Sequence, residues 1–116
     1  MPRRDDSILL RHMLDASLKA VSFVNGKSRG DFDCDEQLGL ATIRLLEIIG
    51  EAANGISDDC KKKHPEMPWL SIVGTRNRLI HGYFDVDGDI VWNIVTQDLP
   101  PLIPKLQLIL RELNSR

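Results

Sequence analysis

The residues best suited to chemistry lie within eight positions of the chain. They are two arginines, an amide, an imidazole and a phenol: Arg76, Asn77, Arg78, His81 and Tyr83. A guanidinium group binds phosphate and stabilises the negative charge that develops on it during a reaction. An imidazole can give or take a proton near neutral pH. This set of residue types can therefore cleave RNA without a metal ion.

The same residues also have ordinary structural explanations. A single histidine near the C-terminus of a helix can stabilise the helix dipole. Arg76 and Arg78 could belong to a solvated helix face, where isolated charges do little. Tyr83 could be a half-buried aromatic residue whose hydroxyl bonds to a neighbouring carbonyl. Residue types alone leave the catalytic and the structural interpretation open.

Apolar residues recur at helical spacing along nearly the whole chain and predict the elements that position these residues. A first helix is expected from Asp5 to a stop at Gly26. A loop over 27–32 leads to a second helix, with Asp33 and Glu36 as its capping box. This second helix is apolar on more than one side. It therefore needs two burial partners, one of which could be a second copy of the chain.

Three further helices are expected in the second half of the chain. Ser57 is the predicted N-cap of a short helix that ends before Pro65. The next spans 69–81 and carries the motif residues. Another begins at Ile90, and the prolines within 100–104 should break or kink it, since proline has no amide donor. The sequence thus predicts an all-α bundle of about five helices without strands.

Composition narrows the class of protein. The 116 residues are expected to form a single domain over 1–116. Fifteen Lys and Arg against seventeen Asp and Glu give a net charge of −2, unlike a typical nucleic-acid-binding domain. Any contact with RNA should therefore come from a local basic cleft. Cys34 and Cys60 lack metal-ligand spacing, and no secretion signal or membrane-spanning stretch is evident. A cytoplasmic protein with reduced thiols is the expectation.

The spacing of Arg76, His81 and Tyr83 resembles the signature of the HepT-like branch of the HEPN superfamily, in which Arg is followed after four residues by His and after one more by Tyr. Other short segments also resemble that family's pattern: Gly50-Glu51-Ala52, Ile90-Val91-Trp92 and Asp98-Leu99-Pro100. The resemblance extends over most of the chain, from about Ile8 to Leu113.

This resemblance implies a homodimeric, HEPN-type up-and-down helical bundle that acts as a metal-independent endoribonuclease. It implies the toxin of a type VII-like toxin–antitoxin pair, with RNA as substrate and an MntA-type minimal nucleotidyltransferase as antitoxin. Arg76 and His81 would be catalytic, and Asn77 and Arg78 would bind or orient the phosphate. The antitoxin would neutralise the toxin by transferring AMP to Tyr83. No metal or other cofactor is implied.

Helix geometry adds a reason to expect a dimer. At roughly 100° per residue, His81 lies about 140° around an ideal helix from Arg76, while Asn77 shares the face of His81. Two copies about a two-fold axis could bring both sets into one composite cleft. The alternative is a non-catalytic helical module that docks a nucleotidyltransferase or nucleic acid, with Tyr83 as nucleotide acceptor. The acidic charge balance favours that alternative.

Overall fold

The protein is a bundle of helices, as the periodicity predicts. The computed structural model describes residues 5–79 and 87–115, except for the side chain of Arg76. All regular elements in these two ranges are helical: α1 (Asp6–Val24), α2 (Arg29–Cys34), α3 (Glu36–Gly55), α4 (Asp58–Lys63), α5 (Trp69–Val73), α6 (Thr75–Leu79), α7 (Gly88–Asn93), the π-helical segment η1 (Ile94–Asp98) and α8 (Leu99–Asn114). The all-α expectation is confirmed. None of the described helices is both long and apolar enough to span a bilayer.

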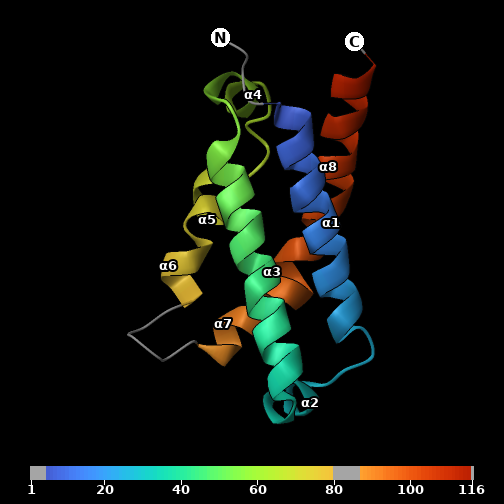
Figure 1. Cartoon of the computed structure of the whole chain (residues 1–116), viewed down its shortest axis with the longest axis vertical. Helices are drawn as coiled ribbons and strands as arrows, with labels where there is room; N and C mark the ends of the chain where they lie inside the picture. Colours follow the sequence, from blue (N-terminus) through green and yellow to red (C-terminus); the bar gives the residue numbers. More distant parts are fainter. Residues whose placement is uncertain (1–4, 80–86, 116) are drawn as a thin grey trace.

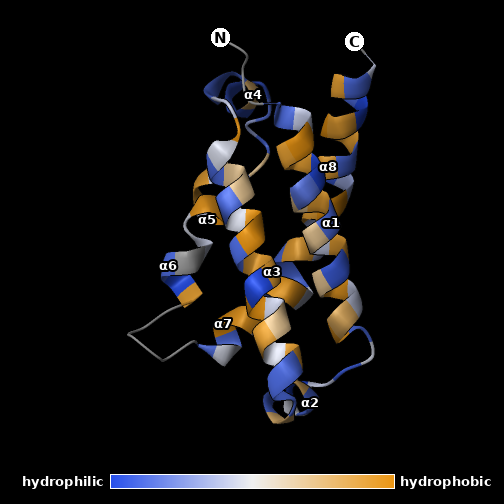
Figure 2. Ribbon diagram, viewed as in Figure 1, coloured by the Kyte–Doolittle hydropathy of each residue, from blue (hydrophilic) through white to orange (hydrophobic). Residues whose placement is uncertain are grey.

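Three long helices form the frame of the bundle. In Figure 1, α1, α3 and α8 run along the long axis of a molecule that measures 46 × 30 × 21 Å. Helix α1 packs against α3 and α8, and the short helices α5 and α6 lie on the other side of α3. Figure 2 shows apolar and polar residues alternating along the long helices, as expected of helices with one buried stripe.

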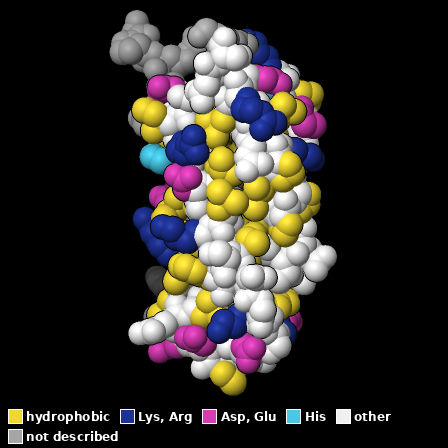
Figure 3. Space-filling view, turned by 90° about the vertical axis from the view of Figure 1, so that its right-hand side faces the viewer, with side chains coloured by type: hydrophobic (Ala, Val, Ile, Leu, Met, Phe, Trp, Pro, Cys, Tyr) yellow, Lys and Arg dark blue, Asp and Glu magenta, His cyan; other side chains and the backbone are white. Residues whose placement is uncertain are grey.

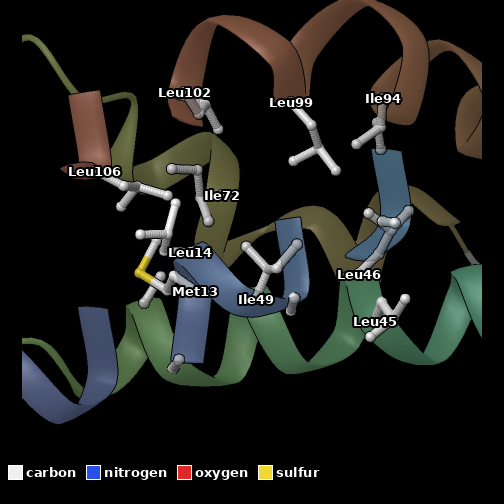
Figure 4. Close-up of a cluster of buried hydrophobic side chains, with 14 of the residues drawn as sticks. Met13, Leu14, Leu45, Leu46, Ile49, Ile72, Ile94, Leu99, Leu102 and Leu106 are labelled. Atoms are coloured by element: carbon white, nitrogen blue, oxygen red, sulfur yellow. The ribbon is translucent and has the colours of Figure 1, made fainter. Parts of the chain in front are cut away.

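The core lies where the long helices meet the second half of the chain. Leu10 and Met13 of α1, Leu46 of α3 and Leu106 of α8 are almost fully buried. Figure 4 shows side chains from α1, α3, α5 and α8 converging in this region. Burial of such side chains from segments far apart in sequence supplies the main force that holds the bundle together.

The broad apolar face of α3 is explained within one copy of the chain. Helix α1 covers one side of α3, while α5 and α6 cover another. The buried residues Leu45, Leu46 and Ile49 face these partners. A second copy is therefore not required to bury α3, although Leu40 stays 62% exposed on it. The homodimer stays a prediction.

Helix starts follow the capping rules, but not always at the predicted residue. Ser57 caps α4 by accepting from the Cys60 amide, as expected. The capping box predicted at Asp33 and Glu36 is wrong, because Asp35 caps α3 by accepting from the amide of Leu38. A capping box lies earlier, where Ser28 and Asp31 start α2 inside the region expected to be a loop.

The helix predicted over 69–81 is divided. Gly74 ends α5 with its amide donating to the carbonyl of Leu70, and α6 begins at the next residue. A side chain at position 74 would lie 3.1 Å from that carbonyl oxygen, so glycine permits the tight junction. The division matters because α6 carries the start of the motif on a separate short helix.

The prolines do not interrupt the helical path within the described residues, and whether they kink it stays a prediction. Pro100 and Pro101 lie in the first turn of α8, which follows η1 directly. Pro104 lies inside α8, which nevertheless continues to Asn114. The irregularity falls just before the prolines, in η1, where the amide of Leu99 donates to the carbonyl of Ile94.

Candidate active site

The motif begins on α6, a helix of five residues held by its two ends. Thr75 and Leu79 are 6% and 1% exposed, and they share one face because they are four residues apart. The Thr75 hydroxyl also donates to the Ser71 carbonyl at 3.2 Å. Asn77 and Arg78, between these anchors, are exposed. The anchors therefore leave Asn77 and Arg78 facing solvent.

A glycine fixes the distance between α3 and the helices that carry the motif. A Cβ atom added at Gly50 of α3 would lie 3.2 Å from the carbonyl oxygen of Ile72 in α5. The absence of a side chain lets α3 and α5 approach closely at this point. Gly50 belongs to one of the segments that suggested the family. The other two residues of that segment make different contacts. Ala52 is buried, and a carboxylate oxygen of Glu51 lies 3.5 Å from a guanidinium nitrogen of Arg44.

A hydrogen bond joins Leu79 and Asp87, the described residues on either side of positions 80–86. The Leu79 carbonyl accepts from the Asp87 amide at 2.9 Å. The Asp87 carboxylate caps α7 by accepting from the amides of Asp89 and Ile90. Asp87 thus serves as the cap of the helix expected to begin near Ile90.

Helix α7 is tied in turn to α2. Arg29 bonds to Asp89 at 2.8 Å and also to Asp33, and these two interactions raise the pKa of the Arg29 guanidinium. The rings of Phe32 and Trp92 lie 5.5 Å apart, centre to centre, in a tilted contact. Helix α7 is therefore anchored to α2 by both polar and aromatic contacts.

A cleft of about 450 Å³ opens beside α6. Its floor consists of buried apolar side chains from α3, α5, η1 and α8: Leu46, Ile49, Ile72, Ile94, Leu99 and Leu102. Figure 4 shows Leu99 and Leu102 facing Ile49 and Ile72. Thr75 and Arg78, one turn apart on α6, form part of its wall. The cleft thus joins an apolar interior to the helix that carries the motif.

The rim of the cleft carries both signs of charge. Arg78 and Lys105 supply cations, whereas Glu66 and Asp98 supply carboxylates. These charges balance among the described residues of the rim, and the local basic cleft expected for RNA contact stays a prediction. No described group of three or more His, Cys, Asp or Glu residues is arranged to hold a metal ion.

The structure places only part of the predicted site. Asn77 and Arg78 lie exposed on α6, and the backbone of Arg76 lies between Thr75 and Asn77 in the same helix. The side chain of Arg76, and all of His81 and Tyr83, lie outside the described residues. The predicted angle between Arg76 and His81 thus stays a prediction.

Sequence reasoning missed the cleft itself. Its polar residues Glu66, Gln97, Asp98 and Lys105 come from separate segments and have no shared spacing. Only packing brings them beside Arg78. Asp98 did stand out in the sequence, but only as one of three residues in a family-like segment.

Comparisons with known proteins identify the family. The family described as "Ribonuclease HepT-like" matches residues 13–109. A Methanocaldococcus jannaschii protein named "Putative RNase MJ1380" is 35% identical over 109 residues, which cover 94% of this chain and 100% of that protein. A Thermococcus cleftensis protein named "Probable ribonuclease HepT" is 47% identical over 77 residues, 66% of this chain and 70% of that protein. No solved structure gives a significant match. The match over residues 13–109 shows that this chain belongs to the HepT-like ribonuclease family.

Proposed function

We propose that this protein is a ribonuclease whose reaction needs no metal ion and takes place at the surface of α6 and the segment that follows it. The observation that carries the proposal is the exposure of Asn77 and Arg78 on a helix anchored by buried Thr75 and Leu79. This arrangement presents an amide and a guanidinium to solvent two residues before the segment that contains His81. The family and the names of its relatives support the same activity.

In the proposed reaction, the 2′-hydroxyl of one ribose attacks the adjacent phosphorus. A bond forms between phosphorus and the 2′-oxygen, and the bond between phosphorus and the 5′-oxygen breaks. A general base removes the proton of the 2′-hydroxyl, and a general acid gives a proton to the leaving 5′-oxygen. His81 takes part in one of these proton transfers. Arg76 and Arg78 stabilise the extra charge on the phosphate. Asn77 orients His81 or the phosphate. The second copy in a dimer supplies the complementary acid or base.

The test is an RNA cleavage assay with purified protein in excess EDTA. His81→Ala should lower the rate roughly 10²–10⁴-fold, the usual loss when proton transfer is removed. Arg76→Ala should lower it comparably. His12→Ala and Arg11→Ala are matched controls, because both residues are exposed on α1. Circular dichroism must show that all four variants keep their helicity. Wild-type cleavage by folded His81→Ala protein would disprove the catalytic assignment.

The proposed biological role is that of a toxin held in check by a nucleotidyltransferase antitoxin. The expected site of modification is Tyr83, two residues after His81. Addition of AMP would place a bulky, negatively charged group beside the proposed active site, where it would compete with RNA phosphate for the arginines.

A non-catalytic docking module is the second candidate, and the balanced charges around the cleft favour it. Such a module would bind the nucleotidyltransferase or nucleic acid without cutting RNA. The cleavage assay separates the two, since a docking module would show no cleavage that depends on His81.

A further inference from the structure

The cleft beside α6 has the features of a small-ligand site rather than of a packing defect. Its volume of about 450 Å³ lies within the roughly 300–1,000 Å³ of typical ligand pockets. Its floor is apolar and buried, while the polar residues around it sit at the rim. Ligands with apolar faces and polar edges suit an apolar floor with a polar rim, because the faces can leave water while the edges keep hydrogen bonds.

Several polar groups at the rim are available to a ligand. Asp98 is the N-cap residue of α8, yet its side chain accepts no capping hydrogen bond. The side chains of Arg78 and Gln97 likewise make no hydrogen bond or ion pair within the described part of the chain. Lys105 makes only a long contact, 3.5 Å, with the Glu66 carbonyl. Arg78 and Lys105 offer positive charge to a phosphate. The Asp98 carboxylate and the Gln97 amide oxygen can accept hydrogen bonds from a donor on the ligand.

We infer that the cleft binds the base of a ribonucleotide that carries an exocyclic amine, with its phosphate on Arg78. Adenine, guanine and cytosine carry such an amine, and uracil does not. The Asp98 carboxylate accepts from the amine, while Leu99 and Ile72 enclose the faces of the base. Arg78 lies one turn from Thr75, so the bound phosphate adjoins the helix that carries Arg76.

This inference rests on the proposed function, because it makes the cleft the subsite for the base next to the cleaved phosphate. It gives the enzyme a preference for sequence that the phosphate contacts alone cannot supply. Base selection follows from hydrogen bonds at the base edge, whereas charge contacts to phosphate are indifferent to sequence.

The experiment is methyl NMR with isoleucine δ1-methyl labels. Ile49, Ile72 and Ile94 line the cleft, whereas Ile8 and Ile109 do not and serve as internal references. Adenosine, guanosine and cytidine 5′-monophosphates should shift the three cleft methyls in a saturable way. Uridine 5′-monophosphate should bind at least about tenfold more weakly, the change expected from one lost hydrogen bond to a charged group. Ribose 5-phosphate should not shift the cleft methyls.

Two pairs of variants localise the binding. Gln97→Phe should block the cleft mouth, and Gln107→Phe is its matched control because Gln107 is exposed on α8 but does not line the cleft. Arg78→Gln should weaken binding of the phosphate, and Arg111→Gln, at an exposed arginine of α8 that does not line the cleft, should not. Equal shifts with ribose 5-phosphate, equal affinity for uridine monophosphate, or undisturbed binding to Gln97→Phe protein would each overturn the inference.

The outcomes separate this inference from the proposed function. RNA cleavage that depends on His81, without nucleotide shifts at the three methyls, overturns the base site alone. Nucleotide binding in the cleft, without any cleavage that depends on His81, supports the base site and overturns the ribonuclease proposal alone.

Discussion

Single residues decide what α6 shows to solvent. Thr75 and Leu79 bury one face of the helix, so Asn77 and Arg78 lie on a surface whose position is set by the core. Leu79 has a second role, since its carbonyl accepts a hydrogen bond from the Asp87 amide. An apolar residue therefore both anchors α6 and joins it to the residue that caps α7.

Tyr83 gives a prediction at this scale. Co-expression with the nucleotidyltransferase should add one adenylyl group to the wild-type protein, because the phenol is the expected acceptor. Tyr83→Phe should cut RNA at the wild-type rate, gain no mass and escape neutralisation. Intact-mass spectrometry measures the addition, and a growth assay measures the escape. Added mass on Tyr83→Phe protein would show that the acceptor is another residue.

Among the elements, the contact between α3 and α5 should be sensitive to one added methyl group. Alanine normally stabilises a helix interior relative to glycine by roughly 0.5–1 kcal/mol. Gly39 has nothing within 4 Å of an added Cβ atom, whereas Gly50 would place that atom 3.2 Å from the Ile72 oxygen. Both lie in α3 and can be compared with the same substitution.

Gly39→Ala should therefore stabilise the protein, and Gly50→Ala should be less stable than Gly39→Ala by about 1 kcal/mol or more, because the Cβ must displace α5. Urea unfolding measures the difference. Gly50→Ala should also lower RNA cleavage, since α6 moves with α5. A gain in stability at Gly50 equal to that at Gly39 would contradict the proposed close packing.

The start of α2 gives a prediction about pH. The Ser28 amide donates to the Asp31 carboxylate at 2.9 Å and, with the Ser28 side chain, lowers its pKa below 3.8. A carboxyl group with a lowered pKa adds stability above its unfolded pKa and loses it as the pH falls through the folded value. Asp31→Asn should thus be less stable than wild type near neutral pH, and the difference should vanish in strong acid. Urea midpoints that differ equally at both pH values would refute this.

At the scale of the molecule, the sequence could predict the long helices but not their junctions. Apolar periodicity and Ser57 marked α1, α3 and α4, because capping and burial stripes are local properties. The division at Gly74 and the π-helical segment before Pro100 depend on packing between elements. The cleft could not be predicted, since Leu46, Ile72 and Leu99 meet only in the folded chain.

Two faces of the molecule could bind a second copy of the chain. Apolar side chains run along the side where α1 and α8 lie (Figure 3), and Ile8, Leu18 and Leu108 are exposed on these helices. On the other side, Leu70 of α5 is 91% exposed and adjoins α6. A composite active site requires a face near the motif, and Leu70 lies on the helix that immediately precedes α6. Leu70→Glu should therefore dissociate the dimer, and Leu108→Glu should not, as measured by light scattering.

The last prediction tests whether two copies share one site. Light scattering should give about 26 kDa, twice the 13.1 kDa chain. If Arg76 of one copy works with His81 of the other, Arg76→Ala and His81→Ala proteins should each be inactive. A mixture unfolded and refolded together should recover about a quarter of the wild-type rate, because half of the dimers are mixed and each has one intact site of two. A site built within one copy would leave the mixture inactive, and a monomer that cuts RNA would exclude sharing altogether.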